Sequence, residues 1–249
     1  MAVYLTKTDK TTLVGLYIAK FDHEALAALG FSGMWQAFNV LGYSLGSSPA
    51  SIKNYRDEFD RLFPGNPRKG WNRELKTRSK NIFEDFSSLD FDSFTELIKG
   101  FLIPHYEDEK AIEAVVKKTD ANDSVAKRLI TGRAAEEYFK KAYSSIDEFE
   151  GYDLLDTTTF ACGFDFKLSF VREYYCVEVK GLSQASGSVM FTEKEYNVAH
   201  ELRTKYCLFV VKNFSERPYH QLFFDPLRSR LVFQRNEQFV RQISFSAVV

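Results

Sequence analysis

Asp165, Glu178 and Lys180 are the side chains whose types and spacing could do chemistry. Residues 163–170 alternate apolar and polar side chains, and so do residues 174–180, so each segment predicts a half-buried β-strand. If the two strands pair as an antiparallel hairpin with a two-residue turn, Asp165 lies opposite Glu178. Directly opposed side chains have Cβ atoms ~4.5–5.5 Å apart. The hairpin would therefore bring two carboxylates together on one face, with Lys180 two residues along it.

Carboxylates held that close repel each other, and each raises the pKa of the other unless a cation lies between them. Mg²⁺ takes one or two protein carboxylates and keeps water and phosphate oxygens in its remaining positions. A bound metal lowers the pKa of water and neutralises charge in phosphodiester hydrolysis. We therefore expect Mg²⁺, with Mn²⁺ as a substitute, at Asp165 and Glu178, and Lys180 beside the water or the developing charge. The alternative is an edge hairpin with a solvated polar face.

Four short motifs occur in a fixed order along the C-terminal half. They are Gly132-Arg133-Ala134-Ala135-Glu136, Gly163-Phe164-Asp165, Glu178-Val179-Lys180-Gly181 and Phe191-Thr192-Glu193-Lys194-Glu195. The ordered set resembles the PD-(D/E)xK nuclease superfamily, and more narrowly its restriction-type and NO VEIN-like members. The resemblance covers about residues 124–215, a little over a third of the chain. Each motif is short, so the specificity lies in their order.

The resemblance implies a core of a helix, three or four strands, a second helix and a further strand. It implies that Asp165 and Glu178 are metal ligands and that Lys180 positions or activates water. It adds Glu136 of the first helix as a further acidic residue, for which a surface glutamate is the alternative interpretation. Phe164 stands where the superfamily name places a proline, a departure common in that superfamily.

The segment after Lys180 supplies three secondary candidates. Residues 181–188 form a glycine- and serine-rich loop leaving the expected metal site, so Gln184 and Ser188 could touch the substrate, although such residues also simply form loops. Thr192 and Glu195 have the spacing of a capping box at a helix start. That spacing explains Glu195 structurally, which is why it ranks below the other acidic residues.

The N-terminal half reads as helices, and two of them resemble a helix-turn-helix module. Ser48 and Pro49 are a helix cap and a first-turn proline, and they follow a Gly-Ser turn. The helix that they start is expected to expose side chains that bond base edges and phosphates. These side chains are Ser51, Lys53, Asn54, Arg56 and Asp57. The alternative is an ordinary helical domain with a solvated polar face.

Charge is distributed unevenly in this half, although the net charge of the whole chain is only −1. Basic residues outnumber acidic ones between positions 53 and 80, whereas the stretch from 82 to 123 is acidic. Arg68, Lys69 and Arg73 fall on a loop after a proline- and glycine-rich break and could follow a phosphate backbone. Binding through them should weaken with salt. Trp71 in the same loop is expected to pack rather than to stack on bases.

Composition narrows the class of protein. The 249 residues are 45% hydrophobic, which allows a sizeable core, and no apolar run is long enough to cross a membrane. The three cysteines are widely spaced in apolar sequence, so they indicate reduced residues of a cytoplasmic protein. The four histidines are scattered, which argues against a histidine zinc site.

Together these features predict an α+β or α/β protein. Residues 1–104 are expected to form an all-helical, helix-turn-helix-like DNA-recognition domain, 105–123 a linker, and 124–249 a restriction-endonuclease-like mixed sheet flanked by helices. The expected function is Mg²⁺-dependent cleavage of double-stranded DNA by a type II-like restriction enzyme, acting as a homodimer in host defence. The alternative is a catalytically inactive DNA-binding regulator or partner-binding protein with a nuclease-like fold.

Overall fold

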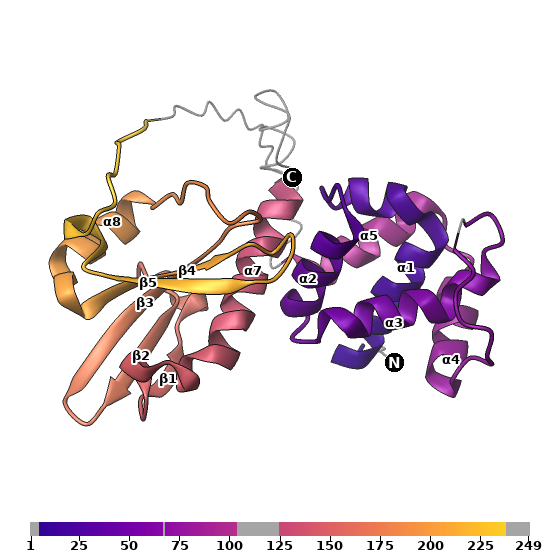
Figure 1. Ribbon diagram of the computed structural model, residues 1–249, viewed down its shortest axis with the longest axis horizontal. Coiled ribbons are helices and arrows are strands. Elements are labelled where there is room, and N and C mark those ends of the chain that lie inside the picture. The colour runs from indigo at the N-terminus through magenta and orange to yellow at the C-terminus, as the bar shows by residue number, and fades with distance from the viewer. Residues whose placement is uncertain (1–4, 67, 104–124, 238–249) are drawn as a thin grey trace, which may run out of the picture.

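The computed structural model describes residues 5–66, 68–103 and 125–237, and it confirms an α+β architecture with a helical N-terminal half and a mixed sheet in the C-terminal half (Figure 1). The helices of the N-terminal half are α1 (Lys7–Ala28), α2 (Met34–Ser44), α3 (Pro49–Phe59), α4 (Thr77–Phe86) and α5 (Phe91–Leu102). Two further helices, α7 (Val125–Ala142) and α8 (Glu193–Leu202), accompany the sheet. The expected linker, 105–123, lies outside the described residues.

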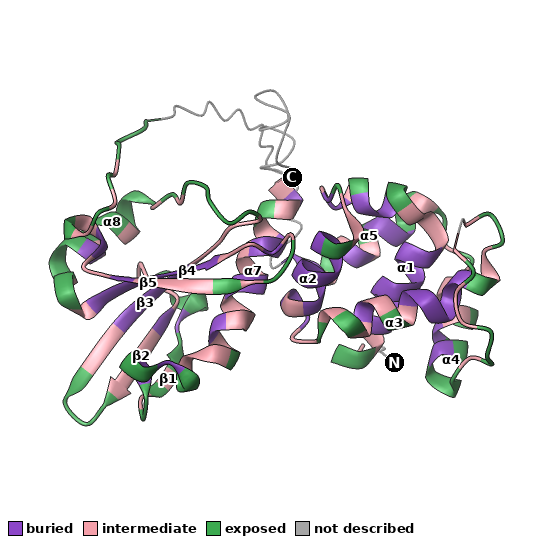
Figure 2. Cartoon of the chain, viewed as in Figure 1, coloured by how far each residue is buried: buried purple, intermediate pink, exposed green. Residues whose placement is uncertain are grey.

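Helix α1 runs through the middle of the helical half and is buried along much of its length (Figure 2). Thr6 and Asp9 form a capping box at its start, which satisfies two backbone N–H groups that a helix end leaves free. The backbone leaves helical geometry at Asp22 (φ 46°, ψ −120°), so α1 is two helical segments joined at a kink. Gly15 lies where α3 crosses, and a Cβ there would collide with Tyr55, so glycine permits the close crossing.

Helix α3 starts as the sequence predicts. Ser48 Oγ accepts a hydrogen bond from the Ser51 N–H at 3.1 Å, and Pro49 is the first helical residue, where its missing N–H costs nothing. Helix α2 precedes it, and the turn between them is tight because Gly42 lies against the backbone of Pro49. Two helices joined by a short turn are therefore present where the sequence predicts them, and their role in DNA recognition stays a prediction.

The sheet contains five strands in the order β1-β2-β3-β4-β5. They are β1 (Asp153–Asp156), β2 (Phe166–Phe170), β3 (Glu173–Gly181), β4 (Tyr206–Lys212) and β5 (Tyr219–Phe224). Strands β3 and β4 are parallel, and the other neighbours are antiparallel. The parallel pair needs a long connection, which contains α8. The sequence did not predict the short edge strand β1, and residues 231–234 are not part of the sheet.

Helix α7 covers one face of the sheet and α8 packs against the other. Phe139 of α7 packs on Phe166 and Phe209, whereas Ala199 of α8 packs in a separate cluster with Cys176 and Tyr206. The two faces follow the alternation of side chains along β3. Its apolar set faces α7, and the set that carries Glu178 and Lys180 faces α8.

The two halves meet where α2 packs against α7 (Figure 1). Tyr43 of α2 contacts Tyr138 of α7, with ring centroids 5.5 Å apart. The buried Asn39 donates two hydrogen bonds, at 2.8 Å to Phe214 O and 2.7 Å to Glu216 O. One hydrophobic cluster consequently runs from the helical half into the sheet.

None of the described helices is long and apolar enough to span a bilayer. All three cysteines are free thiols, and Cys176 and Cys207 are buried.

Replacing Asn39 should weaken the junction between the halves. Asn39→Ala leaves the carbonyls of Phe214 and Glu216 without their donor, so the free energy of unfolding should fall by ~1–3 kcal/mol in urea denaturation. Trp35→Ala, on the exposed side of the same helix, is the matched control and should change it by less than ~0.5 kcal/mol. Equal losses in the two variants would contradict a specific role for Asn39.

Candidate active site

The predicted hairpin of β2 and β3 forms in the predicted register. Phe170 pairs with Glu173 and Phe166 with Val177, as the predicted register requires, and the regular pairing ends there. Asp165 lies one residue before β2, where its N–H still donates to Val177 O at 3.0 Å. Its carboxylate accepts a hydrogen bond from the Val179 N–H at 2.8 Å. Two bonds to β3 thus fix both the backbone and the side chain of Asp165.

Lys180 lies between two acidic side chains on the α8 face. Its Nζ is 2.6 Å from Glu178 Oε1 and 3.1 Å from both carboxylate oxygens of Glu195. Glu195 also closes the capping box of α8, because its carboxylate accepts from the Thr192 N–H at 2.7 Å. The capping box is as predicted. The contact with Lys180 was not foreseen, and it ties the start of α8 to β3.

Burial dominates the electrostatics of the carboxylate pair. Only 3% of Glu178 is exposed. Burial and then the nearby charge of Asp165 raise the pKa of Glu178 to about 9, against the opposing effect of Lys180. Burial likewise raises the pKa of Asp165 to about 6, although the Val179 N–H and Lys180 stabilise its charged form. Nearby carboxylates add to the effect of burial on both pKa values, and a bound cation would offset their repulsion.

The surroundings of Lys180 favour its charged form, unlike those of the two carboxyl groups. Burial disfavours its charge, but the attraction of Glu178 and Glu195 outweighs burial and raises its pKa. The side chain is therefore an ammonium at neutral pH. It is a hydrogen-bond donor held at the edge of the carboxylate pair.

Glu136 reaches this electrostatic environment from α7. Burial, and then repulsion from Asp165, raises the pKa of Glu136 to about 7, while Lys140 acts against the rise. Asp156, at the end of β1, also raises the pKa values of Asp165 and Glu136. Sequence reasoning missed Asp156 because it did not predict β1, whose pairing with β2 brings Asp156 opposite Phe166.

The donor set fits a magnesium ion held by few protein ligands. Asp165 Oδ1 and Glu178 Oε2 accept no hydrogen bond within the part of the chain that the structure describes, so one oxygen of each carboxylate is free for a cation. Among those residues no group of three or more His, Cys, Asp or Glu side chains is placed to hold a metal. Glu136 thus does not complete a three-ligand cluster. Two carboxylates are nonetheless what Mg²⁺ commonly takes from a protein.

The loop after Lys180 is fastened at its start and exposed farther on. Gln184 Nε2 donates to Ser215 Oγ at 3.1 Å, and Gln184 O accepts from the Asn213 N–H at 3.0 Å. Gln184 therefore has a structural partner, whereas Ser188 is exposed. The segment that anchors Gln184 is the one that Asn39 of α2 holds from the other side.

Two of the arginines proposed to contact DNA are not free to do so. Arg56, expected on the exposed face of α3, is buried with Asp57, because its guanidinium pairs with Asp57 and Asp60 and lies over the Phe38 ring. Arg68 donates to both oxygens of Asp60, at 2.9 and 3.0 Å, and to Asp22 Oδ1 at 2.6 Å. The expectation of a free polar face was wrong for Arg56 and Asp57, because helical periodicity does not reveal these carboxylate and aromatic partners.

The remaining proposed DNA contacts lie on the surface around α3. Ser51, Asn54 and Arg73 line a cavity of about 280 Å³, and Lys69 is exposed. Lys53 pairs with Asp57 at 2.7 Å while keeping part of its side chain exposed.

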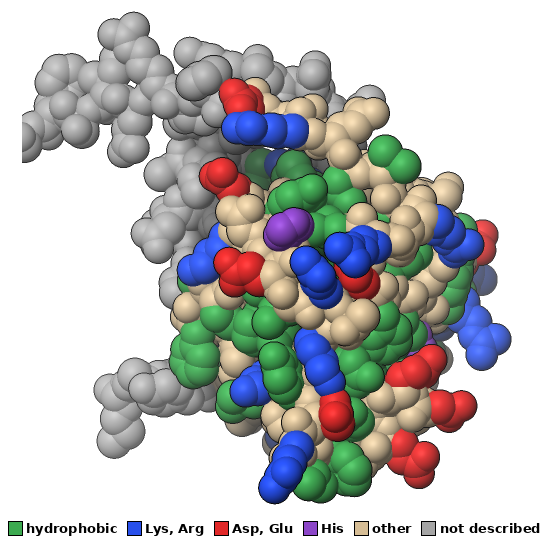
Figure 3. Space-filling view, turned by 90° about the vertical axis from the view of Figure 1, so that its left-hand side faces the viewer, with side chains coloured by type: hydrophobic (Ala, Val, Ile, Leu, Met, Phe, Trp, Pro, Cys, Tyr) green, Lys and Arg blue, Asp and Glu red, His purple; other side chains and the backbone are tan. Residues whose placement is uncertain are grey.

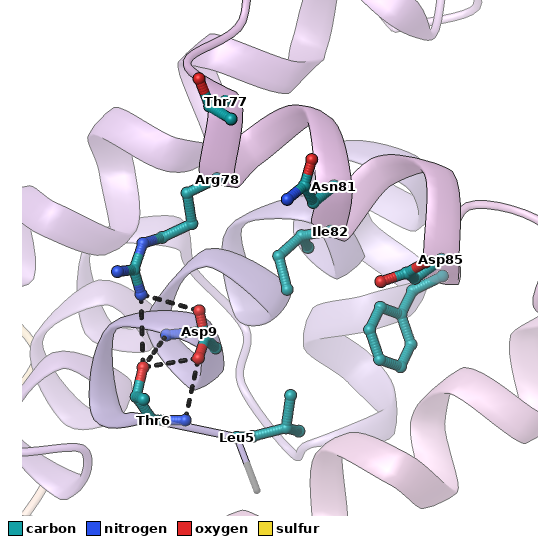
Figure 4. Close-up of a pocket in the computed structure, with 9 residues that line it drawn as sticks. Leu5, Thr6, Asp9, Thr77, Arg78, Asn81, Ile82 and Asp85 are labelled. Atoms are coloured by element: carbon teal, nitrogen blue, oxygen red, sulfur yellow. Dashed lines mark hydrogen bonds and ion pairs between the residues drawn. The ribbon is translucent and has the colours of Figure 1, made fainter. Parts of the chain in front are cut away.

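A larger cavity, of about 450 Å³, lies between the start of α1 and α4 (Figure 4). Leu5 and Ile82 give it apolar walls, and Asp9 is taken up by the helix cap and by Arg78, at 2.7 Å. Its lining does not include the residues around Asp165, so it contributes nothing to the carboxylate site.

The face of the molecule on the sheet side carries interspersed acidic and basic side chains, not one large block of either sign (Figure 3). Such a surface gives little long-range attraction for a polyanion. A nucleic acid would have to be held there by local contacts.

Residues 135–224 match the family described as Protein NO VEIN, C-terminal, a domain of the PD-(D/E)xK-like nuclease type. The matched segment runs from the middle of α7 to the end of β5 and includes Glu136, Asp165, Glu178, Lys180 and Glu195. No curated protein and no solved structure matches the chain. The C-terminal part is therefore similar to a nuclease-like domain.

Neutralising Glu178 should stabilise the metal-free protein at high pH. Its pKa is raised on folding, so its stabilising contribution is complete below the ordinary value of 4.5 and is lost as the pH rises towards about 9. In buffer with a chelator, Glu178→Gln should match the parent near pH 4.5 and exceed it near pH 9 by at least ~1 kcal/mol. Urea unfolding at the two pH values measures the difference.

Glu201→Gln is the control, since Glu201 lies near the end of α8 and is exposed. Its effect on the free energy of unfolding should not grow with pH. A Glu178→Gln variant that is less stable than the parent at the higher pH would show that ionised Glu178 supports the fold.

Proposed function

We propose that the protein is a Mg²⁺-dependent DNA endonuclease, and that it acts as a type II-like restriction enzyme in host defence. The observation that carries this proposal is the buried Glu178 next to the half-buried Asp165, each with a carboxylate oxygen left free near the Lys180 ammonium. Placing two carboxylates next to each other away from water lowers the stability of the fold. A site with a structural role alone would gain nothing from that arrangement. The match to a nuclease-like domain supports the same assignment.

Asp165 and Glu178 would hold the metal ion. Bound Mg²⁺ would supply a water of lowered pKa and neutralise charge on the phosphate. The Val179 N–H orients Asp165, and Glu195 orients Lys180, so the ammonium is held where it can donate to a phosphate oxygen or to the attacking water. Glu136, with its pKa near neutrality, can hold a proton within the same electrostatic environment.

In this proposal the helical half holds double-stranded DNA through the exposed side chains near α3. Ser51, Lys53, Asn54, Lys69 and Arg73 remain the candidates for these contacts. Cutting both strands of a duplex favours a homodimer whose two-fold symmetry matches a palindromic site. Sedimentation with and without DNA tests the assembly.

A second candidate function is binding without catalysis, as a regulator or partner-binding protein. The close pair of Lys180 and Glu178 favours it, because the ammonium already compensates one carboxylate without a metal. The near-neutral net charge is consistent with it too. The two functions differ in whether bonds in DNA break.

Cleavage of plasmid DNA with Mg²⁺ tests the proposal directly. The parent should convert supercoiled plasmid to nicked or linear forms with Mg²⁺ or Mn²⁺ and not with a chelator. Asp165→Asn should lower the rate by at least ~100-fold by removing a metal ligand. Lys180→Met should lower it by ~10²–10⁴-fold by removing a positioned proton donor.

Lys167→Met is the matched control, because Lys167 lies on the same hairpin and contacts the Tyr174 ring. It should cleave like the parent. A parent that binds DNA but cuts none of a library of methylated and unmethylated sequences with either metal would establish the binding function instead.

Salt dependence tests the contacts near α3. In the metal-free protein, replacing Lys69 and Arg73 together by alanine should make the plot of log Kd against log salt shallower, by ~0.9 for each phosphate that the protein no longer neutralises. Arg61→Ala, a second exposed arginine at the end of α3, is the comparison variant and should leave the slope close to that of the parent. An unchanged slope in the double variant would remove the loop from the interface.

A further inference from the structure

We propose that the cavity between α3 and residues 71–76 binds a single nucleobase, unstacked from a DNA strand, that carries an exocyclic amino group. The cavity has a volume of about 280 Å³. It is lined by Asn54 and Glu58 of α3 and by Trp71, Arg73 and Lys76 of the loop. This inference rests on the proposal that DNA is the substrate, but not on catalysis.

The loop that forms one wall is fixed to α3 at several points. Gly70 has a φ of +61°, and a Cβ there would lie 2.6 Å from Asp57 O, so only glycine allows the backbone to come this close. The Trp71 N–H donates to Asp57 O at 2.8 Å. Arg68 adds its bonds to Asp60 and Asp22. The wall is therefore preformed, which lowers the entropic cost of binding a ligand.

The inner end of the cavity carries a buried acceptor. Only 2% of Glu58 is exposed, and its Oε1 accepts from the Lys76 N–H at 3.0 Å. Within the described part of the chain, no lysine or arginine side chain forms an ion pair with it. A buried carboxylate that only one backbone N–H compensates is costly, and an amino group of a base is a donor of the kind that carboxylates accept from.

The side walls suit a flat ring. Trp71 is half-buried, and the Arg73 guanidinium lies 3.9 Å from its ring centroid, so the loop already places one planar cation on this indole. Base recognition outside the helix combines such stacking with hydrogen bonds to the base edge. Asn54 is exposed at the opening and offers a donor and an acceptor to that edge. Arg73 and Lys76 are exposed cations for the attached phosphate.

The carboxylate also sets the selectivity. Adenine, cytosine and guanine each carry an exocyclic amino group with two N–H donors, whereas thymine has none. The one donor on the pairing edge of thymine is its ring N3–H, which lies between two carbonyl oxygens that repel a carboxylate. The cavity should therefore bind thymine more weakly than the other three bases.

The fluorescence of Trp71 gives a direct test, because the chain has only two tryptophans. In a Trp35→Phe background Trp71 is the sole reporter, and Trp35 is exposed on α2, so the change should be tolerated. Titration with dAMP, dCMP and dGMP should quench the emission saturably. TMP should bind at least tenfold more weakly, and inorganic phosphate should not quench.

Two variants locate the binding. Glu58→Gln can still accept from the Lys76 N–H, and its amide NH₂ can face a carbonyl, so the tenfold preference against TMP should shrink or reverse. Asn54→Ala should weaken binding of all the amino-bearing nucleotides. Asn81→Ala, in the larger cavity on α4, is the matched control and should bind like the Trp35→Phe parent.

Saturable quenching that is equal for TMP and dCMP, quenching by phosphate alone, or no quenching at all would each overturn the proposal. The titration is done without metal and again with Asp165→Asn. Selective quenching without DNA cleavage would keep the base pocket and remove the nuclease. DNA cleavage without quenching would support the nuclease function and overturn the base pocket.

Discussion

The burial of Glu178 next to the half-buried Asp165 is the constraint on which the C-terminal half depends. Asp165 lies close to Glu178 because its N–H bonds to Val177 O and its carboxylate accepts from the Val179 N–H, the residues on either side of Glu178. The Val179 N–H and the Lys180 ammonium compensate part of that cost, and burial still keeps both pKa values high. The pairing of β2 with β3 and the cap of α8 through Glu195 thus keep these acidic side chains close together around Lys180.

Local patterns carried much of the prediction. The alternation along residues 163–170 and 174–180 predicted the hairpin, its register and the face that Glu178 and Lys180 share, because a period of two leaves a single pairing that buries the apolar set. The caps at Ser48 and Thr192 were likewise readable from short sequence motifs. These features depend on neighbours within a few residues, so the sequence contains them.

What the sequence could not provide depends on contacts between distant segments. Arg56 and Arg68 looked like free basic side chains, yet carboxylates from α3 and from the kink of α1 engage them. The strand β1 is too short to give a periodic signal, and Asp156 was missed with it. The buried Glu58 was invisible for the same reason, since the loop that covers it is brought back by Gly70 and Arg68.

The hydrogen bonds of Asn39 have a consequence for how the chain could be divided. Residues 213–216 are hydrogen-bonded to Asn39 of α2 on one side and to Gln184 on the other. Gln184 belongs to the loop that leaves Lys180. A chimera with a different helical half would therefore need a helix equivalent to α2. Without it, residues 213–216 would lose the hydrogen bonds from Asn39, close to the carboxylates. The two halves are therefore not independent modules, because both depend on the contacts of residues 213–216.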